Sequence, residues 1–273
     1  MKTYKTPYGD MYIDTNSKQN IIALSGGFDS AVMLYCLAKT LNDKFSDAVI
    51  HPYTVQRGNP TSEPEYNRVH IIPYVRRIIK YVREKFPRVT IKDSVIEVAN
   101  YHWVAENKDG ANISSYTKAQ DTAIRYLIWR HKKQTFTISN DNFNNSITTY
   151  NGVTRNPPPG CIPDSEEQHR DKLHPEQNDP GIATVYFEGS RWVGKFSFDF
   201  NEYQCWRNAD KRIVFWVADQ EDVLDDMLNM TRSCEGGPVE TENFTKVCGE
   251  CWWCLERDWA HKNYMNLDIK HEE

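Results

Sequence analysis

Residues 20–41 read NIIALSGGFDSAVMLYCLAKTL. This pattern predicts a short buried strand that ends near Leu24, a glycine turn, and a helix that begins about Ser30. A strand followed by a tight turn and a helix is the first half of a βαβ unit. The stretch therefore favours a fold of the α/β class.

The same alternation continues through the first half of the chain. Apolar runs predict further strands at 48–56, 91–98 and 135–139. Apolar residues spaced three and four apart predict helices over 65–86 and 116–133. Strands that alternate with helices favour a parallel sheet with helices on both faces.

The alternation stops after Ser139. Residues 140–181 are rich in Asn, Pro, Asp, Glu and His and have no apolar period, which predicts an irregular insertion. Such a segment is either a functional loop or a surface insertion. Residues 184–200 predict a β-hairpin, and residues 219–230 predict a short helix.

Three regions follow from this pattern. We expect an α/β core at 1–139 and an irregular insertion with a hairpin at 140–205. We expect a C-terminal helical region with a cysteine site at 206–273.

Composition limits the kind of partner. The net charge of −5 argues against broad, sequence-independent binding of nucleic acid, because such binding needs many Lys and Arg contacts to phosphates. Binding of nucleic acid through a local basic patch remains an open alternative. No apolar run approaches the roughly 20 residues that cross a bilayer, and the first residues have no apolar core typical of a secretory signal. We therefore expect a cytoplasmic, soluble protein with no membrane partner.

The turn from Ser25 to Ser30 has the composition of a phosphate-binding loop. Two glycines allow backbone N–H groups to converge on an anion, and Ser25 and Ser30 add hydroxyl donors. The start of a helix adds unpaired N–H groups and a partial positive charge. Asp29 either caps backbone donors or acts through Mg²⁺. The structural alternative is an ordinary strand-to-helix connection with an N-capping serine.

Four of the seven cysteines lie close together in the sequence, at Cys234, Cys248, Cys251 and Cys254. Four thiolates complete the tetrahedral shell of a structural Zn²⁺, which leaves no position for a catalytic water. Fe–S ligation uses similar spacings, so iron is the alternative metal. We expect one structural Zn²⁺ per chain.

The string SGGFDS resembles the SGGxDS pattern of the PP-loop, or N-type ATP pyrophosphatase, family. It lacks the Gly-Lys-Ser/Thr of a Walker loop. The resemblance implies an adenine nucleotide alpha hydrolase-like fold and AMP-forming use of ATP with Mg²⁺, with Ser25 and Asp29 as catalytic residues. The ATP-binding residues that it implies here are Leu24, Ser25, Gly26, Gly27, Phe28, Asp29 and Ser30.

The chain also resembles the QueC family, the 7-cyano-7-deazaguanine (preQ0) synthases of queuosine biosynthesis. Thr231-Arg232-Ser233-Cys234 is similar to its Thr-x-Ser-Cys segment, and residues 248–257 resemble its CGxCxxCxxR ending. Gln56 and Arg57 resemble a Gln-Arg pair after its second strand, which implies nucleotide binding. The resemblance implies an ATP-dependent carbon–nitrogen ligase that converts 7-carboxy-7-deazaguanine, with ammonia, to the nitrile. A homodimer is compatible with it.

The middle of the chain departs from the QueC pattern. Ser115-Tyr116-Thr117-Lys118-Ala119 stands where a Val-Pro-x-Arg-Asn type segment is expected, and Lys118 is the candidate for its catalytic basic group. Residues 140–155 replace the family's substrate segment. The resemblance therefore implies that the core at 1–139 is the PP-loop nucleotide-binding part and that the insertion and hairpin at 140–205 lie on the substrate side. Two alternatives therefore stay open beside the ligase. One is a PP-loop enzyme with another acceptor, such as a protein amine or sulfur, and the other is a nucleotide-binding module without turnover.

Overall fold

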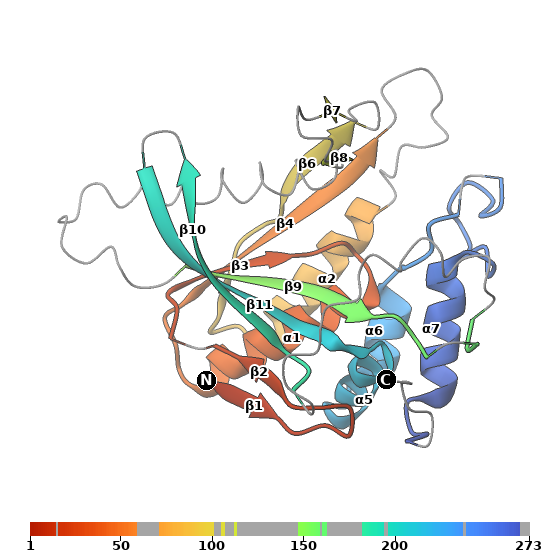
Figure 1. The fold of residues 1–273 in the computed structure, drawn as a ribbon, viewed down its shortest axis with the longest axis horizontal. Coiled ribbons are helices and arrows are strands. Elements are labelled where there is room, and N and C mark those ends of the chain that lie inside the picture. The colour runs from red at the N-terminus through yellow and green to blue at the C-terminus, as the bar shows by residue number, and fades with distance from the viewer. Residues whose placement is uncertain are drawn as a thin grey trace.

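A computed structural model describes residues 1–14, 16–58, 71–100, 105–106, 112–113, 147–158, 160–162, 182–193, 196–236 and 239–267. The protein has a mixed α/β fold, in which helices flank a mostly parallel central sheet (Figure 1). The helix predicted at 116–133, with Lys118, and the strand predicted at 135–139 lie outside the described residues.

The central sheet has seven strands in the order β10-β11-β9-β3-β4-β5, and β6 also pairs with β4. Neighbouring strands are parallel, except that β10 and β11 are antiparallel. The strands are β3 (Gln19–Ala23), β4 (Val49–Gly58), β5 (Thr90–Ile91), β6 (Val95–Asn100), β9 (Ile147–Arg155), β10 (Val185–Val193) and β11 (Phe196–Asp210).

Strand β3 lies at the point where the order of the sheet changes direction. Gln19 of β3 is opposite Val49 of β4 on one side and Ile147 of β9 on the other. The chain continues from β3 to β4 and later reaches β9 on the opposite side of β3. In open parallel sheets, such a switch point leaves a crevice at the carboxyl ends of the strands. The turn at Ser25–Ser30 follows β3 at this crevice.

The described helices are α1 (Phe28–Asp43), α2 (Ile71–Lys85), α5 (Arg212–Gln220), α6 (Leu224–Met230) and α7 (Trp252–Asn263). Helix α1 contacts α2, α5 and α6, and α5 contacts α7. Twelve of the sixteen residues of α1 are buried, so this helix is the centre of the helical layer. Its apolar residues belong to the hydrophobic core, together with those of β3, β4 and α5.

Two smaller antiparallel pairs complete the described fold. Strands β1 (Lys2–Tyr4) and β2 (Met11–Ile13) form a hairpin, and β2 contacts β11. Strands β7 (Ala105–Glu106) and β8 (Asn112–Ile113) form the other pair. Neither pair is indicated by the sequence pattern, because these strands are only two or three residues long.

The prediction of an irregular segment over residues 140–181 is wrong for Ile147–Arg155, which form β9 in the middle of the sheet. Thr148, Thr149 and Tyr150 are buried although two of them are polar, so an apolar pattern was absent. The β-branched threonines still suit a strand. The remainder of the segment that the structure describes is 156–158 and 160–162.

The hairpin predicted at 184–200 is confirmed by the pairing of β10 with β11, and β11 continues to Asp210, through the boundary expected after residue 205. The single helix predicted at 219–230 is wrong in its extent. Helix α5 ends at Gln220, Asp222 has a φ of 54°, and α6 begins at Leu224. A left-handed residue cannot continue a helix, so the chain forms two short ones.

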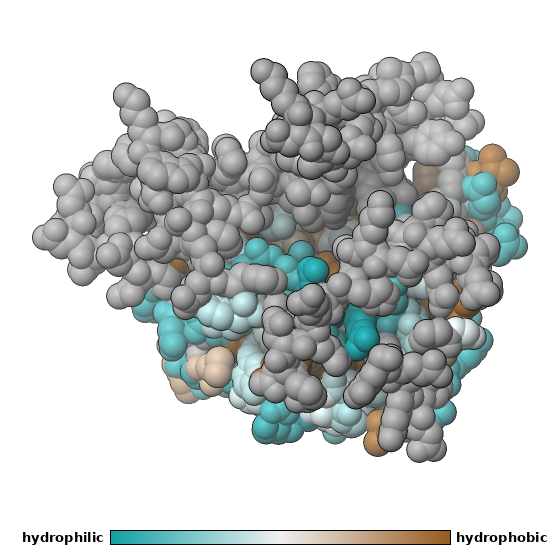
Figure 2. All heavy atoms as spheres, in the orientation of Figure 1, coloured by the Kyte–Doolittle hydropathy of each residue, from teal (hydrophilic) through white to brown (hydrophobic). Residues whose placement is uncertain are grey.

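The surface of the described residues on one face is mostly polar, with isolated hydrophobic spots (Figure 2). Large exposed hydrophobic residues such as Phe45, Ile96 and Val239 lie in separate parts of the chain. Among the described residues, no helix has the length and apolarity that a membrane span requires.

Candidate phosphate and metal sites

Hydrogen bonds within the turn hold the serine hydroxyls together. The Ser25 and Ser30 Oγ atoms lie 3.1 Å apart, and the Ser25 N–H donates to Ser30 Oγ over 3.2 Å. The Gly27 N–H donates to Ser25 Oγ over 3.3 Å. Gly26 has a φ of 80°, which favours glycine, and an added Cβ would lie 3.2 Å from the Ile71 carbonyl oxygen. The turn is thus compact, and Gly26 is required both by its backbone angle and by its neighbour.

The N-terminus of α1 lies close to β9 at this turn. Gly27 is the N-cap residue of α1, and as a glycine it has no side chain that could cap the helix. The N-cap residue is therefore a glycine and not the serine that the structural alternative expected. A Cβ added to Gly152 of β9 would lie 3.3 Å from the Ser30 backbone N. Glycine at this position allows β9 to approach the first turn of the helix closely.

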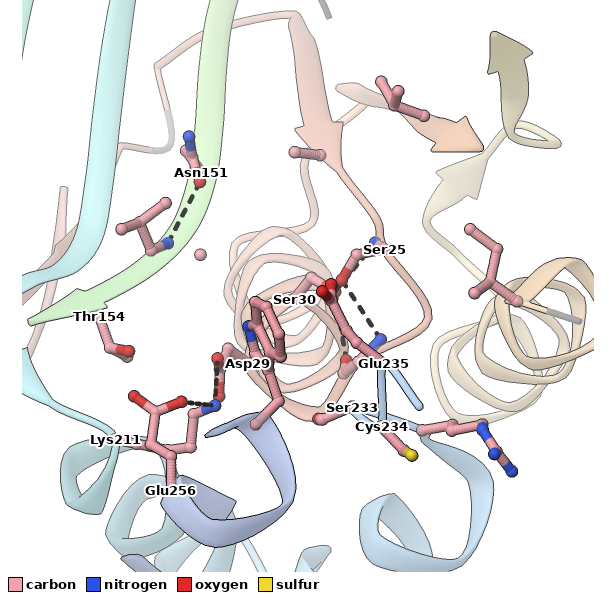
Figure 3. A pocket seen from close by; sticks show the side chains of 18 residues that line it. Ser25, Asp29, Ser30, Asn151, Thr154, Lys211, Ser233, Cys234, Glu235 and Glu256 are labelled. Carbon is pink, nitrogen blue, oxygen red and sulfur yellow. Dashed lines mark hydrogen bonds and ion pairs between the residues drawn. The ribbon is translucent and has the colours of Figure 1, made fainter. Parts of the chain in front are cut away.

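A cavity of about 250 Å³ opens at the carboxyl ends of β3 and β9. Four described segments line it, as do Ala23 of β3, Val55 of β4 and Ile71 of α2. The first is the turn, through Ser25, Gly27, Asp29 and Ser30, and the second is Asn151, Gly152, Val153 and Thr154 of β9. The others are Arg232, Ser233, Cys234 and Glu235, and the start of α7 with Trp253 and Glu256. Lys211, which precedes α5, completes the described wall (Figure 3).

Lys211 joins two carboxylates at the cavity. Its Nζ lies 3.1 Å from Asp29 Oδ2 and 2.6 Å from Glu256 Oε2. The Lys211 and Glu256 side chains are only 2% and 0% exposed, whereas that of Asp29 is 21% exposed. The three side chains converge from three different elements (Figure 3). Burial makes the Lys211–Glu256 pair sensitive to the loss of either charge.

Lys211 and Glu256 were missed by the sequence analysis. Each lies in a short charged run, which is typical of a solvated surface, and the two meet only in the folded chain. A signal was present at Lys211, where a charged run, Asp210-Lys211-Arg212, directly precedes an apolar helix. All three residues are buried, which is unusual for charged side chains.

Arg257 adds a second cation behind the turn. Its guanidinium donates to the carbonyl oxygens of Leu228 and Thr231 at 2.9 and 3.3 Å and lies 5.8 Å from the centre of the Phe28 ring. Burial lowers the pKa of Arg257, and the nearby Asp29 carboxylate partly opposes this shift. The residue links the segment before the cysteine site to the first turn of α1.

The segment that carries the first cysteine touches the turn directly. The Arg232 backbone N–H donates to the Gly26 carbonyl oxygen over 2.9 Å. The Phe28 N–H donates to Ser233 Oγ over 3.4 Å. The Arg232 guanidinium donates to the Phe244 and Lys246 carbonyl oxygens, which fixes the loop that follows the segment. Residues from the two ends of the sequence therefore form one wall.

The four cysteines predicted as ligands come together. All four Sγ atoms lie within 4.8 Å of one another; Cys234 and Cys248 Sγ are 3.5 Å apart, and Cys248 and Cys254 Sγ are 3.9 Å apart. Zn–S bonds of about 2.3 Å in a tetrahedron place sulfur atoms about 3.8 Å apart. The donor set and its spacing therefore fit a zinc ion, and this cluster could bind a metal.

Backbone donors surround these sulfur atoms. The Cys248 and Gly236 N–H groups donate to Cys234 Sγ over 3.2 and 3.4 Å, and the Glu235 N–H donates to Cys251 Sγ over 3.4 Å. Such bonds favour thiolates, the form that binds metal. Hydrogen bonds from the Cys251 and Cys254 thiols lower the pKa of Cys234, whereas the bond to Cys234 raises the pKa of Cys251 to about 11.

The described residues that line the cavity do not include four of the predicted site residues, namely Leu24, Gly26, Phe28 and Gln56. Leu24 is buried in the core, where its N–H donates to the Tyr53 carbonyl oxygen. Phe28 is also buried and stacks on Phe215 at 4.3 Å. Gln56 and Arg57 are strand residues of β4, paired with β6. Their roles in binding stay predictions, and Lys118 lies outside the described residues.

No protein-family model and no curated protein matches this chain. The turn, the cavity and the cysteine cluster are therefore the features that support a function.

Proposed function

We propose that this protein is an ATP-dependent enzyme of the PP-loop kind, with an adenine nucleotide alpha hydrolase-like fold. It splits ATP between the α and β phosphates and activates a carboxylate or an amide as an adenylate. The observation that carries this proposal is that the SGGFDS turn, the N-terminus of α1 and the buried Lys211 ammonium line one cavity at a switch point of the sheet.

The turn offers several donors to a leaving pyrophosphate. Ser25 is exposed at the cavity, Ser30 lies in the first turn of α1, and the first N–H groups of the helix carry a partial positive charge. Lys211 supplies a full positive charge beside them. Developing charge on phosphate oxygens is stabilised best by donors that are already fixed in place, and packing fixes both α1 and Lys211.

Side-chain charge at the cavity explains why Mg²⁺ would be needed. Three carboxylates, from Asp29, Glu235 and Glu256, line it against the basic side chains of Lys211 and Arg232. This balance does not by itself favour a triphosphate, so ATP would bind as its Mg²⁺ complex. Asp29 is the partly exposed carboxylate at the turn and would hold the ion as an oxygen ligand. When bound, Mg²⁺ supplies charge neutralisation on the phosphates.

The proposed reaction has two stages. A substrate oxygen attacks the α-phosphate, the bond from the α-phosphorus to the bridging oxygen breaks, and pyrophosphate leaves into the turn. Ammonia then attacks the adenylated carbon and AMP leaves. The residues of this chain act by positioning the phosphates and by stabilising their charge. The acceptor that the QueC resemblance favours is 7-carboxy-7-deazaguanine, which these two stages would convert to the amide. A second ATP would then adenylate the amide oxygen with release of pyrophosphate, and loss of AMP together with the amide protons would leave the nitrile.

The cysteine cluster is proposed to hold one structural Zn²⁺ through Cys234, Cys248, Cys251 and Cys254. Four sulfur ligands would close its shell, so its role would be to fix the segment before α7 and the start of that helix.

The test is incubation with ATP, Mg²⁺, ammonium and 7-carboxy-7-deazaguanine, with mass spectrometry of all products. AMP together with the amide or nitrile supports the ligase. AMP without a change in the deazapurine supports the PP-loop chemistry with a different acceptor. No nucleotide product with any acceptor would favour a binding module without turnover.

A further inference from the structure

Ser233 lies at the junction between the cysteine cluster and the turn. It directly precedes Cys234, and both residues line the cavity. A Cβ added to Gly27 would lie 3.5 Å from Ser233 Oγ and 3.3 Å from Ser25 Oγ. Two hydroxyl groups from opposite ends of the sequence therefore flank the same glycine.

The hydrogen bonding of Ser233 leaves its proton available as a donor. Ser233 Oγ accepts the Phe28 N–H over 3.4 Å, and a hydroxyl that accepts one bond can still donate its own proton. The Phe28 N–H belongs to the first turn of α1. Backbone N–H groups at this end of a helix are typical donors to bound anions. The long N···O distance is also one that a bound phosphate oxygen can compete with.

The position of Ser233 is fixed from both sides. On one side, the Arg232 N–H donates to the Gly26 carbonyl oxygen over 2.9 Å. On the other side, Cys234 belongs to the four-cysteine cluster, and the Gly236 N–H donates to its Sγ. An added Cβ at Gly236 would lie 2.9 Å from Cys248 Cβ, so this segment packs tightly on the cluster.

We infer that Ser233 is a further phosphate-binding residue of the cavity and that the metal-loaded cysteine cluster holds it in place. Its hydroxyl donates to an oxygen of the bound pyrophosphate group, beside the hydroxyls of Ser25 and Ser30. This inference rests on the proposed function, because it names an additional residue of the same phosphate site. It also gives the cysteine cluster a second role, in which metal loss weakens phosphate binding.

The test is titration calorimetry with inorganic pyrophosphate and Mg²⁺, together with melting temperature and metal content for each variant. Ser233→Thr keeps the hydroxyl. Ser233→Val introduces a side chain of nearly the same shape as threonine but without the hydroxyl. A hydrogen bond to a charged group predicts about tenfold weaker binding for Ser233→Val and near-normal binding for Ser233→Thr. The control is Thr245→Val, an exposed position in the loop between the cysteines.

Metal removal with a chelator is the second arm, because it disturbs Ser233 without changing the sequence. We expect weaker pyrophosphate binding that returns when zinc is restored. Equal affinities of Ser233→Thr and Ser233→Val, at unchanged metal content, would overturn the inference while leaving the proposed function intact. If the unaltered protein bound neither pyrophosphate nor ATP, the proposed function itself would fail.

Discussion

Lys211 Nζ lies 3.1 Å from Asp29 Oδ2, which brings the end of β11 to the first turn of α1. The same ammonium lies 2.6 Å from the buried carboxylate of Glu256 on α7. The Ser25–Ser30 turn, the sheet and helix α7 are thus joined through one buried cation. Because this cation is buried, we expect the stability of the protein to depend on it.

Replacing Lys211 with Met should destabilise the protein by about 3–5 kcal/mol, because Glu256 would stay buried without its cation. The measurement is urea unfolding. The double variant Lys211→Met/Glu256→Gln should recover part of the loss, since it removes both charges. Lys262→Met is the control, because Lys262 forms an exposed i,i+4 pair whose loss costs less than about 1 kcal/mol. A Lys211→Met change as mild as the control would contradict this role for the ion pair.

Replacing Asp29 with Ala should reduce ATP turnover about 100-fold or more while the protein stays folded. Asp29 is partly exposed, and Lys211 keeps Glu256 as its partner. The measurement is kcat with saturating ATP and Mg²⁺, beside the far-ultraviolet circular dichroism spectrum. The matched control is Asp43→Ala at the other end of α1, whose carboxylate pairs with Lys39. If both variants kept normal turnover, Asp29 would have no part in the chemistry.

Replacing Gly26 with Ala should weaken ATP binding, because the turn needs a φ of 80° and has no space beside the Ile71 carbonyl oxygen. The backbone strain alone costs about 1–2 kcal/mol. Gly160→Ala introduces similar strain, since Gly160 has a φ of 76° with no atom within 4 Å of an added Cβ. Both variants should lose some stability, but only Gly26→Ala should bind ATP more weakly. Equal ATP affinities, measured by calorimetry, would argue against the turn as the phosphate site.

Replacing Cys234 with Ser should lower bound metal, shift the fluorescence of Trp252 and Trp253, and reduce the melting temperature by more than about 4 °C. Cys234 is buried, and its Sγ lies within the four-sulfur group. Elemental analysis of the unaltered protein should give one zinc per chain, and iron would overturn the assignment. The control is Cys161→Ser, which lies outside the cluster and should keep full metal content. A Cys234→Ser variant with normal metal and stability would refute the ligand set.

Local patterns predicted the parts of this protein that depend on nearby residues. The turn at Ser25–Ser30 is recognisable because two glycines and the start of a helix lie within six positions, and the cysteines because their spacing suits one metal. The central strand β9 was missed because its buried residues include Thr148 and Thr149, whose polarity imitates a loop. Strand β9 is buried because it pairs with β3 on one side and β11 on the other. These strands are distant in the sequence, so a local pattern carries no information about them.

The ion pair at the cavity could not be predicted for a related reason. Asp29, Lys211 and Glu256 are far apart in the sequence, and each is an ordinary charged residue in its own surroundings. Their meeting follows from the packing of α1 and α7 around α5. The sequence therefore indicated the turn and the four cysteines. The position of Lys211 at the cavity could be seen only in the folded structure.

The most direct test is the identity of the nucleotide products formed from ATP and Mg²⁺ in the presence of an acceptor, measured by phosphorus NMR and anion-exchange chromatography. The central claim is that the turn receives pyrophosphate. We predict AMP and pyrophosphate in equal amounts, with both lost in Asp29→Ala. ADP and inorganic phosphate as the main products would contradict the claim.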